Sequence, residues 1–434
     1  MKMLSKEVAT HIGEKVTVEG WLHKKRLLGG LTFINVRDRG GLVQIVIKDK
    51  DEVEKLRGLQ IGTVLRVEGL ATEEPRAPGG AELHDVSLEV LVPVTEEPPV
   101  EIDKPLSHKP ENLDTLFEHR AIGLRNLQET KIFKIRSELL HYIRDFLYAQ
   151  DFTEMNTPKI VAGDAEGGAA VFKLDYFGKE ATLAQSPQLY KQMMVGVFDR
   201  VFEIGPAFRA ELSATTRHVS EVTMLDVEFG FIDGHDDVLN MLQDLVYNVM
   251  TRLYDEHAAD LKSLNAPELV LKPEFPRYAM SEIHEMYQKA TGKDMSQELD
   301  LTPEEEKWIC EYSKKHDGCE AVFATGLPES KMKFYHMKGE NGTARSADLL
   351  FRGIEISTVP QREHRYDKLI EQMQAAGVDI EAPAFAAYLS AFKHGLPAHG
   401  GFGFGVDRLV EKAIGLGNVK EAILFPRDIN RLAP

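Results

Sequence analysis

The chain has 434 residues, 43% of them hydrophobic and 28% charged, an ordinary balance for a globular protein of two or three domains. Its formal net charge of −17 argues against a protein that coats nucleic acid non-specifically, although a local basic patch could still read one RNA. No apolar run approaches the roughly 20 residues of a membrane span, no secretory signal opens the sequence, and Cys310 and Cys319 lack zinc-ligand spacing. We therefore expect a cytoplasmic protein without membrane contact.

Residues 1–97 are predicted to form a small β domain. Five strand-like runs, separated by polar or Gly-rich turns, occupy 16–26, 31–39, 41–49, 63–74 and 84–94, and one helical stretch lies at 51–58. Five short strands with one interposed helix are typical of an OB-fold Greek-key barrel, an architecture that binds oligonucleotides.

A basic spot lies on the first predicted strand of this domain and its turn, at His23, Lys24, Lys25 and Arg26. On the next two strands, Phe33 offers a stacking face and Gln44 a partner for a base edge. Alternatively, Phe33 belongs to the core and the lysines form a solvated edge. The pattern alone leaves both interpretations open.

Residues 98–128 are Pro-rich and charged, then weakly helical, and are predicted to be a hinge between domains. The domain that follows, 129–434, begins with a strongly amphipathic helix at 130–151 and a strand that meets Pro158.

A Gly/Ala-rich loop comes next, and it contains Glu166. Loops of this composition can move over a ligand. The following stretch passes from a strand into a helix, and it places around the helix start the polar residues Gln185, Ser186, Gln188 and Lys191.

The most informative stretch runs from Val201 to Ile232 and alternates with a period of two, as a pair of strands around a short loop does. The charged face carries Glu203, Arg209, Glu211, Asp226 and Glu228; the apolar face carries Phe202, Ile204, Phe208, Ala210, Leu225, Val227, Phe229 and Phe231. Single charges on strands are usually solvated. Five on one face predict a floor for a zwitterionic or polyanionic small molecule, with guanidinium groups for phosphate and carboxylates for an ammonium or a metal.

Residues 235–340 are predicted to be a mostly helical insert, and no chemistry is assigned to them. Strands return at 344–365 with a turn at Arg352–Gly353, so Asp348 and Glu355 lie on successive strands and offer oxygen ligands to Mg²⁺ bound to substrate phosphates. In the last Gly-rich strand the backbone can approach a nucleotide, and Arg408 then opens a helix, where a guanidinium suits a phosphate.

Three pieces of the chain follow one another in a fixed order. They are the helix and strand that end at Pro158, Phe208-Arg209-Ala210-Glu211 with its hairpin, and Gly403-Phe404-Gly405-Val406-Asp407-Arg408. This order resembles motifs 1, 2 and 3 of the class II aminoacyl-tRNA synthetases over essentially the whole length. With the barrel in front, the chain resembles the aspartyl, asparaginyl and lysyl subgroup. Within it, Gln185-Ser186-Pro187-Gln188-Leu189-Tyr190-Lys191-Gln192 matches the aspartyl enzymes, and the compact size and Phe425-Pro426-Arg427-Asp428 resemble the archaeal type.

The resemblance implies an α+β multidomain protein and a homodimer. An OB-fold β-barrel that binds the anticodon would precede an antiparallel β-sheet catalytic domain flanked by helices. ATP would contact Arg209, Ala210, Glu211, Arg217, His218, Val219, Glu355, Gly405, Val406, Asp407 and Arg408, with Arg209, Glu355 and Arg408 catalytic. L-Aspartate would contact Glu166, Gln188, Leu189, Tyr190, Lys191, Arg209, Asp226, Thr358 and Arg362. Mg²⁺ would be held by Asp348, Glu355 and Thr358.

The chemistry implied is consistent with these residue types. A substrate carboxylate attacks the α-phosphorus in line, so catalysis consists of positioning and charge neutralisation, without a protein nucleophile. By the resemblance, Arg209 would hold the α-phosphate and the attacking carboxylate, while Lys191 and Arg362 would hold the side-chain carboxylate. An asparagine amide would offer NH₂ where these cations need an acceptor, and such a site discriminates strongly.

Two segments depart from the family pattern: Leu212-Ser213-Ala214, which faces the acceptor end of tRNA in relatives, and Thr358-Val359-Pro360, where relatives carry small residues before the glutamine and arginine. Because Pro360 restricts its own backbone and that of Val359, the placement of Arg362 needs a structure. Val222 also replaces an aromatic residue that is common near the adenine in bacterial relatives.

In the barrel, the resemblance aligns Phe33 and Gln44 with positions that read the central anticodon base, beside Arg26. His23 and Pro78 match residues of relatives that charge both tRNA(Asp) and tRNA(Asn). The expected activity is therefore ATP- and Mg²⁺-dependent ligation of L-aspartate to tRNA(Asp), and also to tRNA(Asn).

Three rival interpretations are weighed against this one. Asparaginyl ligation is disfavoured by Lys191. A relative that makes asparagine from an aspartyl-adenylate without tRNA would not need the whole barrel. A non-catalytic RNA-binding paralogue is supported only by the two altered segments, and the intact residues Arg209, Glu211, Asp226, Glu355, Arg362 and Arg408 argue against it.

Overall fold

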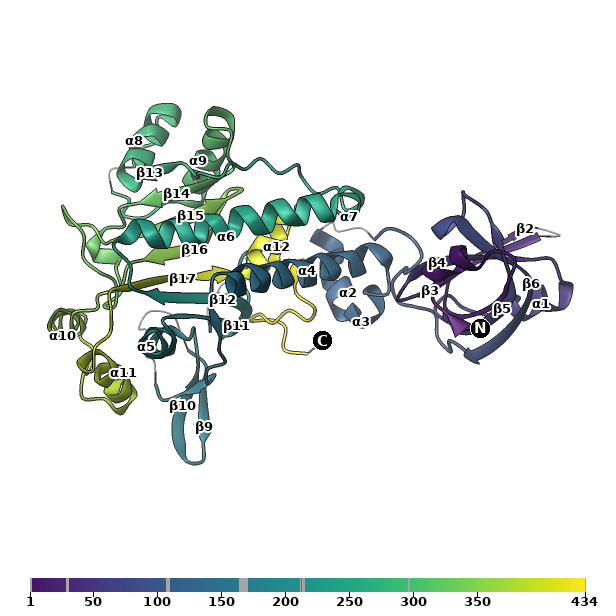
Figure 1. Ribbon diagram of the computed structural model, residues 1–434, viewed down its shortest axis with the longest axis horizontal. Coiled ribbons are helices and arrows are strands. Elements are labelled where there is room, and N and C mark those ends of the chain that lie inside the picture. The colour runs from purple at the N-terminus through teal and green to yellow at the C-terminus, as the bar shows by residue number, and fades with distance from the viewer. Residues whose placement is uncertain are drawn as a thin grey trace. The chain divides into compact units, whose positions relative to one another are not determined.

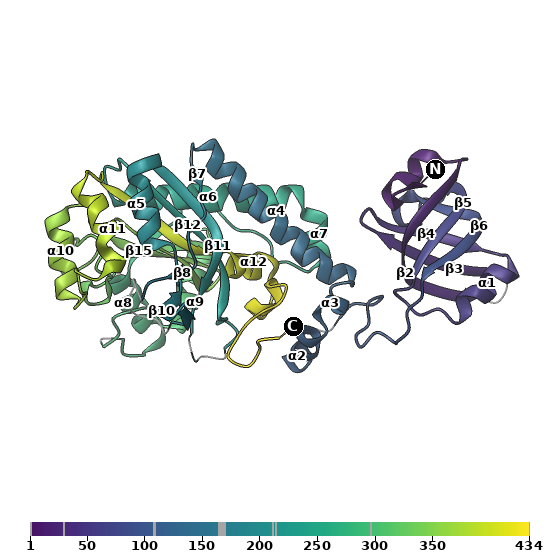
Figure 2. The same cartoon turned by 90° about the horizontal axis from the view of Figure 1, so that it is seen from below.

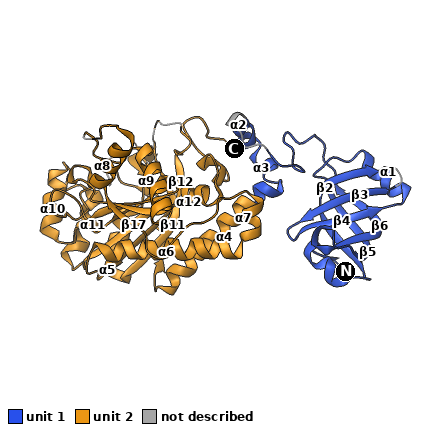
Figure 3. Ribbon diagram, turned by 90° about the horizontal axis from the view of Figure 1, so that it is seen from above, with its two compact units in different colours: residues 1–130 blue, residues 131–434 orange. Residues whose placement is uncertain are grey.

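The computed structural model describes residues 2–28, 31–106, 110–163, 171–210, 212, 215–295 and 297–433. The chain forms two compact units, residues 1–130 and 131–434, shown in two colours in Figure 3. Apolar side chains of the barrel strands form one core cluster, and the second unit has clusters of its own. Among the described residues, no helix combines the length and apolar character needed to traverse a membrane.

Unit 1 contains a closed five-stranded barrel (Figure 1). Its strands run in the order β2-β3-β4-β6-β5, and β5 pairs back onto β2. The bounds are β2 Lys15–Leu28, β3 Leu31–Asp38, β4 Gly41–Ile47, β5 Val64–Glu73 and β6 Ala81–Val92, with α1 Lys50–Arg57 between β4 and β5. Short β1, Lys2–Met3, pairs with β2 in parallel. This strand order with its interposed helix confirms the predicted OB-fold barrel.

The rest of unit 1 is more ordered than a simple hinge. Its short helices are η1 Ser5–His11, η2 Pro78–Gly80, α2 Pro110–Glu118 and α3 Arg120–Gly123. After the barrel, Val100, Leu113, Leu116 and Phe117 form a small apolar cluster. Beside it, Arg120 donates from Nη1 to Glu129 at 3.4 Å, and both side chains are buried.

Unit 2 is built on an eight-stranded sheet in the order β13-β14-β15-β16-β17-β12-β11-β7. Its pairings are antiparallel except for β13–β14 and β7–β11 at the two edges. The bounds are β7 Thr153–Glu154, β11 Arg200–Phe208, β12 Glu221–Gly230, β13 Arg277–Ala279, β14 Ala321–Thr325, β15 Ser346–Phe351, β16 Ile354–Pro360 and β17 His399–Gly405. The antiparallel catalytic-type sheet is thus as expected.

Two long helices, α4 Leu127–Ala149 and α6 His235–Glu256, run across one face of this sheet (Figures 1 and 2). Apolar residues at helical spacing on both helices share one buried cluster with the inward side chains of the strands. The helix α12, Val406–Ile414, follows β17 directly and belongs to the same cluster.

The segment 235–340 differs from the expected helical insert because it contributes β13 and β14 to the main sheet. Its helices after α6 are α7 Ala258–Ser263, α8 Met280–Thr291, α9 Pro303–His316 and η3 Glu329–Lys331. The buried Cys310 and Cys319 lie here as free thiols, within apolar surroundings.

Smaller elements surround the main sheet. A three-stranded sheet consists of β8 Ile160–Val161, β9 Lys173–Tyr176 and β10 Lys179–Leu183. The helices α5 Gln188–Phe198, α10 Tyr366–Ala375 and α11 Pro383–Lys393 contribute to one apolar cluster, and η4 Val419–Ala422 follows α12. The expected apolar face of the hairpin ends before Phe231, which follows β12 with φ of 55° and is 76% exposed.

Candidate functional site

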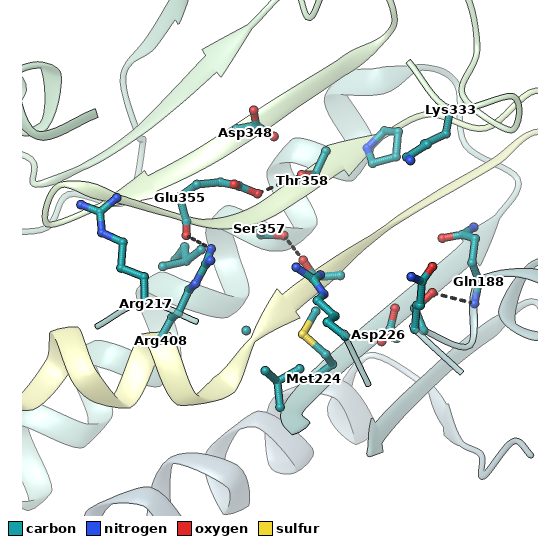
Figure 4. A pocket seen from close by; sticks show the side chains of 18 of the residues that line it. Gln188, Arg217, Met224, Asp226, Lys333, Asp348, Glu355, Ser357, Thr358 and Arg408 are labelled. Carbon is teal, nitrogen blue, oxygen red and sulfur yellow. Dashed lines mark hydrogen bonds between the residues drawn. The ribbon is translucent and has the colours of Figure 1, made fainter. Parts of the chain in front are cut away.

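A cavity of about 570 Å³ opens over the part of β12 that carries Asp226. Its lining residues come from α5, α9, α12, β12, β15, β16 and β17 and from loops and turns near them. Figure 4 shows two groups of side chains in it. Arg217, Arg408, Asp348 and Glu355 lie toward one end, and Gln188 and Asp226 lie toward the other.

The first end carries a pair of carboxylates on neighbouring strands. Asp348 on β15 pairs directly with Thr358 on β16, and the Thr358 hydroxyl donates to Glu355 Oε1 at 3.1 Å. Burial and the nearby Glu355 raise the pKa of Asp348 well above its ordinary value. A cation or a proton would therefore stabilise this pair of carboxylates.

The residues present fit a magnesium ion that keeps most of its ligands as water and phosphate oxygen. Such an ion is usually held by one or two carboxylates. Among the described residues, no group of three or more His, Cys, Asp or Glu side chains is placed to hold a metal. The oxygen donors that line this end of the cavity include Asp348, Glu355 and the Thr358 hydroxyl.

Two arginines face these carboxylates. Arg408, in the first turn of α12, donates from Nη1 to the Glu355 backbone carbonyl at 2.9 Å. Arg217 donates from Nη1 to Glu306 Oε2 at 3.3 Å, and burial together with Glu355 raises the pKa of Glu306. Glu306 lies on α9 within a run of acidic residues, and nothing in that run distinguished it in the sequence.

The opposite end contains a buried lysine surrounded by acceptors. Lys191 Nζ lies 3.0 Å from Asp226 Oδ1 and 3.5 Å from Glu228 Oε2, and it donates to the Phe402 carbonyl at 3.1 Å. Its side chain is only 1% exposed. The amphipathic helix α5 places Lys191 one turn after Gln188, so both reach the cavity.

Arg362 forms a bidentate pair with Glu228. Its Nε and Nη2 donate to the two carboxylate oxygens at 2.9 and 3.1 Å. Burial alone would raise the pKa of Glu228, but Arg362 and Lys191 outweigh it and lower that pKa. The unusual Thr358–Pro360 segment does not interrupt the backbone before Arg362. Strand β16 continues to Pro360, and the Arg362 amide donates to the His399 carbonyl at 3.0 Å.

A network of buried polar side chains is hydrogen-bonded to Gln188 at the Lys191 end of the cavity. Gln192 Oε1 accepts from Gln188 Nε2 at 3.0 Å and from the Tyr388 hydroxyl at 3.1 Å. Its Nε2 therefore donates to His399 Nε2 at 2.9 Å, which assigns the ring proton to Nδ1, bonded to the Pro397 carbonyl at 2.8 Å. Burial lowers the pKa of His399 to about 4, so the ring is neutral.

Motif 3 is tied to the first helix of unit 2 through Asp407. Its carboxylate accepts from Arg136 Nη2 on α4 at 3.0 Å and from the Thr223 amide on β12 at 2.8 Å. Burial raises the pKa of Asp407, and Arg136 partly offsets this. Asp407 thus fixes the start of α12, whose next residue is Arg408.

The cavity brings together most residues proposed from the sequence. Its lining includes Gln188, Lys191, Arg209, Arg217, His218, Val219, Asp226, Asp348, Glu355, Thr358, Arg362, Gly405, Asp407 and Arg408. Leu189 packs in the apolar cluster with α10 and α11, Val406 packs in the main core, and Tyr190 and Ala210 are not among the lining residues. Glu166 and Glu211 lie outside the described residues.

Sequence reasoning missed several residues at the cavity. These include Asp300, Glu306, Lys331, Lys333, Tyr335 and His336, all from the segment that was expected to carry no chemistry. Glu203 was expected on the floor, but it binds Lys159 Nζ at 2.6 Å and the Thr157 hydroxyl at 2.6 Å instead.

The barrel carries a second candidate surface. On its outer face, two rows of side chains run across β2, β3 and β4: Arg26, Phe33 and Val46 in one row, and Lys24, Asn35 and Gln44 in the other. The neighbouring residues of β3, Ile34 and Val36, point into the core. The interpretation of Phe33 as core is therefore wrong.

Three of the predicted residues of the barrel have partners or are buried. Gln44 Nε2 donates to Glu82 at 2.7 Å, and Lys25 Nζ donates to the Leu59 carbonyl at 2.6 Å. His23 is buried beside a bulge in β2. Pro78 is half-buried in η2.

Solved structures of known proteins share this architecture. The asparaginyl-tRNA synthetase from Pyrococcus horikoshii, complexed with asparaginyl-adenylate, matches with a TM-score of 0.90 and 31% identity, covering 100% of both chains. An aspartyl tRNA synthetase from Entamoeba histolytica matches with a TM-score of 0.86 and 25% identity, covering 100% of this chain and 93% of the other.

Similar sequences include the aspartate–tRNA(Asp/Asn) ligase of Thermus thermophilus, 41% identical over 100% of both chains, and the aspartate–tRNA(Asp) ligase of Pyrococcus abyssi, 40% identical over 97% of both. Residues 16–94 match the model of the OB-fold nucleic acid binding domain. Residues 112–429 match the model of the class II tRNA synthetases (D, K and N). The chain therefore belongs to the class II tRNA synthetases of the D, K and N group and carries an OB-fold nucleic acid binding domain before its catalytic sheet.

Proposed function

We propose that this protein is an aspartate–tRNA ligase. Its family uses ATP as a substrate, and relatives about 40% identical over nearly their full length are named aspartate–tRNA ligases. The observation that carries the choice of amino acid is the buried pair of cations, Lys191 and Arg362, at the end of the cavity opposite the phosphate-binding arginines. Two convergent cations suit a side-chain carboxylate, and they reject an amide.

In the first step, the aspartate α-carboxylate attacks the α-phosphorus of ATP, the bond to the bridging oxygen breaks, and pyrophosphate leaves. Arg209 is proposed to hold the α-phosphate, and Arg217, His218 and Arg408 the distal phosphates. Gln188 and Asp226 accept from the substrate ammonium. In the second step, a hydroxyl of the terminal adenosine of tRNA attacks the adenylate carbonyl and AMP leaves.

Magnesium is proposed as the metal of this reaction, held by Asp348, Glu355 and Thr358. When bound, it would neutralise charge on the phosphate oxygens. The raised pKa of Asp348 supports this assignment, because a buried carboxylate beside a second one is stabilised by a cation.

The barrel is proposed to bind the anticodon through the outer face that carries Arg26, Phe33 and Gln44. An aromatic ring and a guanidinium on an OB-fold face provide stacking and backbone contacts to single-stranded RNA. We propose residues 1–97 for this role, 98–128 as connector and 129–434 as catalytic domain. A cytoplasmic homodimer is also proposed, and light scattering of the purified protein tests its oligomeric state.

Charging of both tRNA(Asp) and tRNA(Asn) is proposed as the tRNA specificity. His23 and Pro78 support it through their match to non-discriminating relatives. Relatives with either specificity in their names are about 40% identical to this chain, so overall similarity does not separate the two.

The deciding experiment is ATP–pyrophosphate exchange with aspartate or asparagine, followed by charging of separate tRNA(Asp) and tRNA(Asn) transcripts. Exchange with aspartate and charging of both transcripts are expected. Exchange with asparagine instead would favour an asparaginyl enzyme, the class of the similar structure from Pyrococcus horikoshii. Exchange without charging would favour a tRNA-independent enzyme, and absence of exchange would favour an RNA-binding paralogue.

A further inference from the structure

Arg352 occupies an unusual backbone position for a long side chain. It forms, with Gly353, the two-residue turn between β15 and β16, where φ is 48° at Arg352 and 82° at Gly353. Two-residue hairpins favour positive φ at both positions, and Asn-Gly is the preferred pair because other side chains are strained there. The presence of an arginine in this conformation calls for a compensating role of its side chain.

The guanidinium of Arg352 is almost fully engaged and only 9% exposed as a side chain. Its Nε and Nη2 donate to Glu320 Oε1 at 2.8 and 2.6 Å, and Nη1 donates to the Tyr254 hydroxyl at 3.0 Å. Nη2 also donates to the Glu268 carbonyl at 2.8 Å. The turn is thereby joined to α6, to the start of β14 and to the loop after α7.

Two further contacts of this guanidinium go to the end of α12. Nη1 donates to the Lys412 carbonyl at 2.7 Å and to the Ala413 carbonyl at 3.4 Å. The last carbonyls of a helix have no partner within it and carry partial negative charge, so a buried guanidinium both satisfies and neutralises them.

The same hairpin contacts α12 a second time, one helical turn earlier. There Arg408 Nη1 donates to the Glu355 carbonyl at 2.9 Å. The hairpin therefore grips α12 at two points, Arg352 at its end and Glu355 at its beginning. This arrangement fixes the helix along its axis against the strand that carries Glu355.

We propose that Arg352 is a positioning residue for the ATP and Mg²⁺ end of the active site. It holds α12 against the β15–β16 hairpin so that Arg408 and Glu355 keep the separation that phosphate and metal require. The inference rests on the proposed function, in which these two residues serve ATP and Mg²⁺. The aspartate end is built mainly from α5, β12 and Arg362, to which the contacts of Arg352 described above do not extend.

The test compares the full-length protein with three variants. R352N keeps a residue that suits the turn but removes the guanidinium, and R352K keeps a positive charge. The matched control R277N removes a guanidinium that pairs with Asp236 and Asn240 at the edge strand β13. Exchange of ATP and pyrophosphate is measured while ATP, Mg²⁺ and aspartate are varied in turn, and thermal unfolding is followed for each variant.

For R352N we expect the KM for ATP and the half-saturating Mg²⁺ concentration to rise at least about tenfold, because Arg408 and Glu355 lose their fixed separation. The KM for aspartate should stay within about twofold, R352K should be intermediate, and R277N should resemble the wild type. An equal rise in both KM values, or a lower unfolding temperature with an unchanged KM for ATP, would show a merely structural role and overturn the proposal.

If R352N does not fold, R352K decides. A folded R352K with a raised KM for ATP and an unchanged KM for aspartate supports the proposal, and one with wild-type constants overturns it. A wild-type protein that shows no exchange with aspartate would overturn the proposed function itself, and this inference with it.

Discussion

Lys191 and Arg362 each bring a full charge into the interior, and the protein pairs both with carboxylates before any substrate is present. Glu228 contacts both cations and is completely buried. A buried charge without a partner is strongly destabilising, so Glu228 is needed to keep the two cations folded in place. In the sequence, Glu228 was one of five charged residues on a strand face. Only the structure shows that it pairs with Lys191 and Arg362.

The variant E228Q tests this support. The amide NH₂ would face the Arg362 guanidinium or Lys191, donor against donor, so we expect the KM for aspartate to rise about 10- to 100-fold, while the KM for ATP changes less than about twofold. Stability should fall by about 3 kcal/mol. Exchange kinetics with varied aspartate and chemical denaturation measure the two effects.

E203Q is the matched control. Glu203 shares the charged face in the sequence, but its carboxylate binds Thr157 and Lys159 rather than lining the cavity. Its substitution should lower stability without changing the KM for aspartate. Equal effects of E203Q and E228Q on this KM would contradict the assignment.

The raised pKa of Asp348 predicts how the Mg²⁺ requirement changes with pH. Because its pKa is raised, protons compete for this carboxylate at higher pH than for an ordinary aspartate. Metal binding requires the deprotonated form. We therefore expect the half-saturating Mg²⁺ concentration of the wild type to increase as pH falls, by up to about tenfold per unit, and to begin increasing at a higher pH than an ordinary aspartate would cause.

In D348N the requirement for Mg²⁺ should be higher at every pH and nearly independent of pH, because the competing proton site is gone. Exchange rates at a series of Mg²⁺ concentrations and pH values provide the measurement. A wild-type requirement that does not vary with pH would argue against Asp348 as a ligand.

Strand β17 shows how closely an element can approach its neighbours. A Cβ atom at Gly401 would lie 2.0 Å from the Val227 carbonyl oxygen, whereas a Cβ at Gly403 would meet nothing closer than Asp226 Oδ1 and Met224 Cε, both at 3.5 Å. Gly401 is therefore required by the pairing of β17 with β12. Gly403 lines the cavity and leaves room for substrate.

The two alanine variants should consequently fail in different ways. We expect G401A to lose about 3 kcal/mol of stability or more, because backbone would have to move. G403A should unfold like the wild type but lose at least about tenfold in exchange rate, since its methyl group enters the cavity. Calorimetry and exchange kinetics distinguish these outcomes, and a stable, inactive G401A would refute the assignment.

Elements with local signals were predictable from the sequence. The period-two alternation predicted the β11–β12 pair, and Arg352–Gly353 was predicted as a turn, as the structure confirms. The strands β13 and β14 were not predicted because they are short and lie between helices, and their partners are set by the topology of the sheet. Glu306 reaches Arg217 across 89 residues of chain, a proximity that no local pattern encodes.

At the scale of the molecule, the fold class followed from strand number in the barrel and from motif order in the rest. The buried chain from Tyr388 through Gln192 to His399 did not follow, because it joins α11, α5 and β17. Motifs indicate which side chains touch the substrate. They do not indicate which side chains hold those residues in place.

Separate core clusters predict that the activities can be separated. Apolar residues of the barrel strands form one cluster, and those of the main sheet form another. A fragment of residues 98–434 should therefore fold and retain aspartate-dependent exchange within about tenfold, while its charging of tRNA falls by at least about 100-fold. Exchange and charging assays on the fragment are the measurement. Charging of tRNA by the fragment at the full rate would contradict the proposed role of the barrel in anticodon binding.

The pairing of cations and carboxylates at the aspartate end has a consequence for competition inside a cell. Lys191 contacts Asp226 and Glu228, and Arg362 contacts Glu228, so neither cation lacks a carboxylate partner. We expect a ligand to bind here by replacing the carboxylate partner of one cation and by offering its own cationic group to the carboxylate that it displaces. By the proposed function, aspartate would do both, because its side-chain carboxylate would bind one of these cations and its ammonium would bind the carboxylate that is released. Succinate has the carboxylates but no ammonium, so we expect it to compete poorly with aspartate even where it fits sterically.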